Sequence, residues 1–247
     1  MRHSYGQSDS PDSLPFFRPE RLFPESQIKR PIWLTVETVV VTAAALAGIR
    51  ILNVQGTENL RWFAIPGILV AASLIPTWVG RRAFPVIGLD LEHIGLAVGA
   101  VCRTFVYVLP AIILAFWLMK RLSMPIPLKP VFGRQHDWLT WLLYQFLYVA
   151  VAEEMFFRGY VQANVMRVLN CGRWRSSRTD QGIAVLVSAA CFALAHVIVQ
   201  NQITSIVTFL PGVLLAWLFL RTRSLLAPIL FHGLANVTYG IMAMTLA

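Results

Sequence analysis

Long apolar runs separated by short polar segments fill the sequence from residue 31 onward. A membrane-spanning helix needs about 20 mostly apolar residues, because the hydrocarbon core of a bilayer is about 30 Å thick. About seven runs meet this requirement, with eight as the alternative count, and the proline-rich segment 122–133 is expected to be a re-entrant or surface loop. The expected spans are residues 31–49, 62–79, 94–119, 138–163, 182–199, 203–220 and 225–244.

Composition supports a membrane protein. Hydrophobic residues make up 57% of the chain, charged residues only 13%, and the mean hydropathy is +0.62. A soluble domain has about 25% charged residues. The sequence therefore predicts an all-α, polytopic transmembrane helix bundle that has the lipid bilayer as its surroundings.

Basic residues lie mostly between the apolar runs, so the net charge of +9 reflects membrane topology and does not indicate nucleic-acid binding. Most of them fall on the side of the membrane that carries the N-terminus. This bias predicts a cytoplasmic N-terminus and a C-terminus on the opposite side. The chain divides into a polar tail (1–30), N-terminal spans (31–137) and a C-terminal part (138–247) that holds the paired polar residues.

Two adjacent carboxylates, Glu153 and Glu154, lie within the fourth expected span, and Arg158 follows one turn later. Inserting one ionisable side chain at the centre of a bilayer costs about 3 kcal/mol of free energy on insertion scales. Three such side chains close together therefore indicate a structural or functional role. Glu154 and Arg158 are four residues apart, share a helix face and are expected to pair. Glu153 points about 100° away and lacks a local cation, which suits a general base. A structural network of all three charges is the alternative.

Histidines occur singly in two later spans. His196 follows Phe192 by four residues in the fifth span, and His232 precedes Asn236 by four residues in the seventh. Each pair therefore occupies one helix face. A lone histidine in an apolar helix usually serves packing. Two histidines, an amide and an unpaired carboxylate on three spans indicate a catalytic site.

This set of side chains suits peptide hydrolysis. Glu153 can accept a proton from water, a histidine can hold that water or protonate the leaving amine, and Asn236 with the remaining histidine can stabilise an oxyanion. The serine-hydrolase motif G-x-S-x-G and the zinc-protease motif H-E-x-x-H are both absent from the sequence. Zinc bound by Glu153, His196 and His232 is the alternative, since three such ligands suit a catalytic metal.

These motifs resemble those of the CAAX-protease and bacteriocin-processing family (CPBP, or Abi), which comprises glutamate-type intramembrane proteases similar to the type II prenyl-protein endopeptidase. The resemblance covers about residues 138–240. It is carried by three motifs in order: Glu153-Glu154-x-x-x-Arg158, Phe192-x-x-x-His196 and His232-x-x-x-Asn236.

The resemblance implies a helical bundle with a polar cavity. Glu153 and His196 would activate water, and His232 with Asn236 would support the oxyanion, without a metal. Glu154, Arg158 and Phe192 would be supporting residues. A membrane-associated protein or peptide is the expected substrate, and a bacterial inner membrane is the expected location.

Two other functions remain open for the same fold. A non-catalytic scaffold or immunity protein would need Glu154 and Arg158 for packing but has no need for Glu153, His196, His232 and Asn236 together. A proton-coupled transporter would use buried Glu and His to carry protons and would often show internal repeats. No such repeat is visible in the sequence.

Overall fold

Helices are the only regular elements in the part of the chain that the structure, a computed structural model, describes. That part comprises residues 31–56, 58–85, 91–122, 138–170 and 177–246. The expected all-α class is therefore confirmed. The tail 1–30 and nearly all of the segment 122–133 lie outside the described residues, so their expected states remain predictions.

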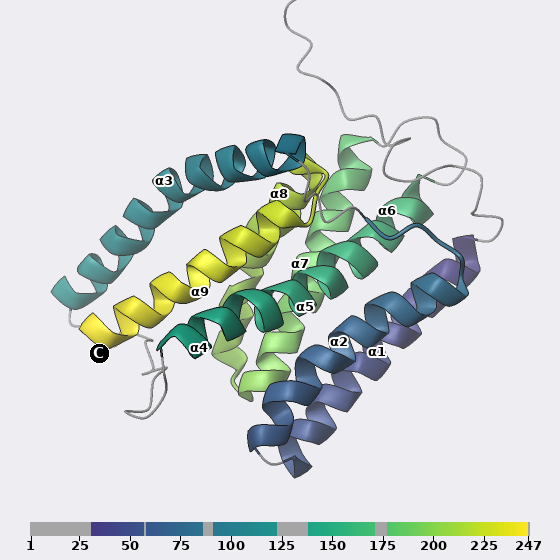
Figure 1. The fold of residues 1–247 in the computed structure, drawn as a ribbon, viewed down its shortest axis with the longest axis horizontal. Helices are drawn as coiled ribbons and strands as arrows, with labels where there is room; N and C mark the ends of the chain where they lie inside the picture. Colours follow the sequence, from purple (N-terminus) through teal and green to yellow (C-terminus); the bar gives the residue numbers. More distant parts are fainter. Residues whose placement is uncertain (1–30, 57, 86–90, 123–137, 171–176, 247) are drawn as a thin grey trace, which may run out of the picture.

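Within the described residues, six helices are long and apolar enough to cross a membrane, which makes the chain a multi-pass integral membrane protein. They lie close to the expected spans, and Figure 1 shows α1 beside α2 on one flank and α3 beside α9 on the other. The six are α1 (Pro31–Gln55), α2 (Glu58–Val79), α3 (Leu91–Arg121), α7 (Arg178–Gln200), α8 (Phe209–Thr222) with the 3-10 helix η5 (Ile203–Thr208) before it, and α9 (Leu226–Leu246).

The remaining expected span is one continuous helix whose winding changes along its length. Its parts are α4 (Trp138–Leu143), the π-helix η3 (Tyr144–Ala150), α5 (Val151–Glu154), the π-helix η4 (Met155–Gln162) and α6 (Ala163–Leu169). In a π-helix each N–H bonds to the carbonyl five residues earlier, so successive side chains turn through a smaller angle than in an α-helix. Such segments are rare and often occur at functional sites. We refer to residues 138–169 as the central helix.

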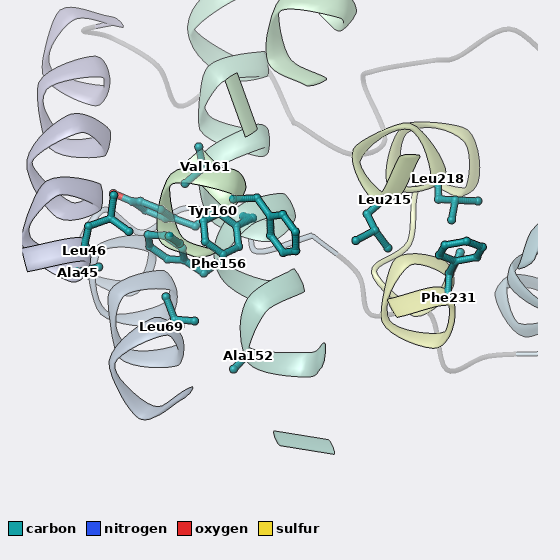
Figure 2. Packing of buried hydrophobic residues seen from close by; sticks show 14 of the residues in the cluster. Ala45, Leu46, Leu69, Ala152, Phe156, Tyr160, Val161, Leu215, Leu218 and Phe231 are labelled. Atoms are coloured by element: carbon teal, nitrogen blue, oxygen red, sulfur yellow. The ribbon is translucent and has the colours of Figure 1, made fainter. Parts of the chain in front are cut away.

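The core of the bundle forms around η4. Phe156 and Tyr160 are fully buried, and Val161 is 1% exposed. Figure 2 shows these side chains beside Leu46 of α1 and Leu69 of α2. Between helices in lipid, apolar burial gives little driving force because lipid tails are equally apolar, so close packing stabilises the association.

Small residues permit this close packing. A Cβ atom on Gly212 of α8 would lie 3.2 Å from the Ala189 backbone and from the Phe192 ring of α7. A Cβ atom on Gly233 of α9 would lie only 2.4 Å from the Phe146 ring of the central helix. Glycine at these two positions therefore lets α7 approach α8 and lets α9 approach the central helix.

A partly buried polar cluster joins α1 to the central helix near the end of α2. Arg82 forms an ion pair with Glu37 of α1 and donates a second bond, of 3.1 Å, to the other carboxylate oxygen. The Tyr160 hydroxyl donates to Glu37 Oε1 over 3.1 Å. Arg82 also donates to the Pro76 carbonyl over 2.8 Å. One carboxylate thus joins three parts of the chain.

The other end of α1 is fastened to α7. Asn53 donates through Nδ2 to the carbonyls of Ile198 and Val199, each over 3.0 Å. Arg50 donates to the Asn201 side chain over 3.0 Å, and Asn201 itself caps α7 in the left-handed conformation, with φ of 51°. These bonds satisfy carbonyls that the end of a helix leaves without partners. They also set the position of the helix that carries His196.

Candidate active site

Glu153 and Glu154 occupy the short α-helical segment α5 between the two π-helices. Their side chains have different surroundings. The Glu154 side chain is completely buried, whereas the Glu153 side chain is 18% exposed. The two adjacent carboxylates therefore differ in their access to solvent.

Glu154 is the centre of a charged hydrogen-bond cluster. Its Oε1 accepts bonds from Arg158 Nη1 over 3.0 Å and from His232 Nδ1 over 2.8 Å. The Arg158 pair is the one predicted from the spacing of the two residues. The His232 bond was not predicted, and it ties α9 to the central helix.

Arg158 extends this cluster to two further helices. Its Nη2 donates to the Gly212 carbonyl of α8 over 3.0 Å, and its guanidinium lies 4.6 Å from the centre of the Phe192 ring of α7. A guanidinium above an aromatic face is attracted by the ring, most strongly where water is excluded. Arg158 is 0% exposed, and buried protein groups accept hydrogen bonds from both of its terminal nitrogens, whereas its Nε has no hydrogen-bond partner among the described residues.

Glu153 faces a cavity. Its Oε2 lies 3.8 Å from His232 Nε2, which is too long for a direct hydrogen bond but lets both atoms contact one water. The same oxygen is buried and accepts no hydrogen bond from the described residues. A buried acceptor without a partner is unusual and calls for a ligand or a water. The expectation that Glu153 is an available carboxylate agrees with this geometry.

The cavity has a volume of about 370 Å³. It is formed by the first half of α2, the first half of the central helix and the ends of α1 and α7. Its lining residues are Asn53, Arg61, Trp62, Ile65, Pro66, Leu69, Tyr144, Val149, Ala152, Glu153 and Val199.

Phe192 lies between the two histidines. Its ring centre is 4.4 Å from that of His196 and 5.8 Å from that of His232. His196 Nδ1 bonds to the Phe192 carbonyl over 3.0 Å, and because a carbonyl only accepts, Nδ1 carries the hydrogen. In a neutral imidazole this leaves Nε2 as an acceptor. Phe192 therefore contacts both histidine rings.

Asn236 lies one turn beyond His232 and donates through Nδ2 to Gln145 Oε1 over 2.8 Å. Gln145 was not singled out from the sequence. It lies in the π-helix η3, and its side chain is where Asn236 of α9 meets the central helix. The only sequence feature that could have pointed to Gln145 is the presence of a glutamine within an apolar run.

The alternative zinc site at Glu153, His196 and His232 has no support in this geometry. Among the described residues, no group of three or more His, Cys, Asp or Glu side chains is placed to hold a metal ion. His232 also engages Nδ1 with Glu154, which leaves it a single nitrogen for any further ligand.

Comparison with known protein families gives one match. Residues 135–238 match the family described as type II CAAX prenyl endopeptidase Rce1-like. The matched segment contains all seven residues of the three motifs, and it confirms the resemblance seen in the sequence. Curated proteins and solved structures gave no match.

The cluster at Glu154 predicts different effects on stability for neighbouring substitutions. Arg158→Ala leaves a buried carboxylate without its cation and is expected to lower the free energy of unfolding by about 3–5 kcal/mol. Glu153→Gln keeps the shape of a partly exposed side chain and is expected to leave the melting temperature nearly unchanged. Thermal unfolding of the purified protein in detergent, followed by tryptophan fluorescence, measures both. Equal losses in the two variants would contradict the separate roles assigned to these residues.

Proposed function

Because residues 135–238 form an Rce1-like segment, we propose that the chain is a glutamate-type intramembrane endopeptidase. Its substrate is a peptide bond in a membrane-associated protein or peptide. One observation carries the proposal: the buried Oε2 of Glu153 has no hydrogen-bond partner among the described residues and lies 3.8 Å from His232 Nε2. A carboxylate in this position can take a proton from a water that both groups contact.

Water activation begins at Glu153. The carboxylate accepts one proton of the water, and the resulting hydroxide attacks the scissile carbonyl carbon. The acceptor Nε2 of neutral His196 is suited to hold the second hydrogen of the water, because its Nδ1–H is fixed on the Phe192 carbonyl. Glu153 then passes its proton to the leaving amine nitrogen as the C–N bond breaks, so hydrolysis consumes one water.

Two side chains of α9 are suited to stabilise the oxyanion. Asn236 uses one amide hydrogen for Gln145 and retains the second for a ligand. The two carboxylates and Arg158 together carry one net negative charge, which a protonated His232 would balance. His232 in that form donates from both nitrogens, to Glu154 through Nδ1 and to the oxyanion through Nε2.

The activity is tested most directly at Glu153. Glu153→Gln removes the base while keeping the size of the side chain, so we expect cleavage to be abolished in a protein that still folds. Quantitative proteomics of membrane peptides, comparing cells with the wild type and with the variant, would show uncleaved substrates accumulating only in the variant. Identical peptide profiles in the two strains would favour a scaffold function over a protease.

The oxyanion role predicts a graded series at α9. Asn236→Ala is expected to lower kcat by about 100- to 1,000-fold, the usual effect of losing one oxyanion donor. Gln145→Ala should cost less, because the amide of Asn236 remains but is no longer held. If Gln145 acts only through Asn236, the double variant should be no slower than Asn236→Ala alone. Independent, multiplying losses would show that Gln145 acts in another way.

We also propose that hydrolysis requires no bound metal. The engagement of His232 Nδ1 by Glu154 and the presence of Asn236, a poor zinc ligand, support this mechanism. Metal analysis of purified, active protein should then find less than one zinc per chain, and chelators should leave the rate unchanged. Stoichiometric zinc, with activity lost on chelation and restored by added zinc, would reassign Glu153, His196 and His232 as ligands.

A further inference from the structure

The cavity beside Glu153 has one charged side chain besides the candidate base. Arg61, in the first turn of α2, is the only basic residue among its lining residues. The guanidinium is half-buried, and no ion pair or hydrogen bond joins it to a residue whose side chain the structure describes. The positive end of the α2 dipole lies at the same place and adds to the positive potential.

Two aromatic side chains line the cavity beside Arg61. Trp62 and Tyr144 pack with ring centres 4.5 Å apart, and the Tyr144 hydroxyl donates to the Trp62 carbonyl over 2.8 Å. Tyr148 stacks on Tyr144 at 5.5 Å and meets Phe63 edge to face at 5.9 Å. Apolar walls lower the local dielectric and so strengthen the attraction between Arg61 and an anion.

The position of Arg61 along α2 gives its distance from the candidate base. Leu69 of α2 and Ala152, next to Glu153, line the same cavity and belong to one core cluster, and both are labelled in Figure 2. Arg61 precedes Leu69 by eight residues, which is about 12 Å along the helix axis. An extended peptide covers that distance in roughly three to four residues.

We propose that Arg61 binds a carboxylate of the substrate and thereby sets how far along the peptide Glu153 acts. The inference rests on the proposed peptidase function and adds a specificity-determining residue to it. The carboxylate belongs either to the C-terminus of the peptide or to an Asp or Glu side chain, at about three to four residues from the scissile bond. A guanidinium suits this role because it binds both oxygens of a carboxylate.

A direct binding measurement tests this proposal without requiring turnover. The probes are one fluorescent apolar hexapeptide in three forms: with a free C-terminal carboxylate, with a C-terminal amide, and as the amide with one internal Glu. Their affinities for the purified full chain in neutral detergent are measured by fluorescence anisotropy. Wild type is expected to bind at least one carboxylate form about tenfold more tightly than the plain amide, as a charge-assisted hydrogen bond provides. The preferred form identifies the source of the carboxylate.

Arg61→Gln is expected to remove this preference, so that the three probes bind the variant with similar affinities. Lys120→Gln is the matched control, because it removes one exposed positive charge at the end of α3, which lies outside the cavity lining. A wild type without a carboxylate preference, or an Arg61→Gln variant that keeps the preference, would overturn the proposal. So would an equal loss in the Lys120→Gln variant, which would indicate general surface charge.

The outcome for Arg61 can be separated from the outcome for the peptidase. If Glu153→Gln causes no change in the membrane proteome but the Arg61-dependent preference is found, the cavity is a carboxylate-binding site without the proposed hydrolysis. If cleavage depends on Glu153 but binding does not depend on Arg61, the peptidase stands and this specificity assignment fails. Thermal unfolding of Arg61→Gln confirms that the variant is folded in either case.

Discussion

A charge buried at the depth of a membrane has to be matched by other polar groups, and in this protein those groups gather around Oε1 of Glu154. One carboxylate oxygen accepts hydrogen bonds from both Arg158 and His232. Arg158 continues to the Gly212 carbonyl and to the face of Phe192. The contacts that begin at this one oxygen therefore connect the central helix, α7, α8 and α9. The polar cluster thus orders the C-terminal half of the bundle as well as its candidate site.

Because Glu153 and Glu154 are adjacent in the sequence, their side chains have different surroundings. Successive residues on a helix point in different directions, so Glu154 faces the buried cluster while Glu153 faces the cavity. His232 connects the two, because its Nδ1 bonds to Glu154 and its Nε2 is 3.8 Å from Glu153. Glu154 fixes the His232 ring through Nδ1, and Nε2 is on the side of Glu153. A supporting carboxylate behind a histidine is a common way to fix which nitrogen carries the hydrogen.

The spans were predictable from hydropathy alone, because length and apolarity are properties of consecutive residues. The Glu154–Arg158 pair was predictable as well, since both residues belong to one helix and the spacing of four is local. The bond between Glu154 and His232 was not, because it depends on how α9 is rotated about its own axis. Gln145 was missed for the same reason, because its bond with Asn236 depends on how α9 packs against the central helix.

The cavity also shows that the matched segment does not build the whole site. Residues 135–238 supply Glu153, Tyr144 and the end of α7, but α1 and α2 supply the opposite wall, including Arg61 and Trp62. The polar clusters at Glu37 and at Asn53 hold α1 in place at both of its ends. Two proteins that share the matched segment and differ in their first two helices would therefore keep the same candidate catalytic groups and have different cavities beside them. In evolutionary terms, the candidate catalytic groups and the opposite cavity wall are encoded in separate parts of the chain.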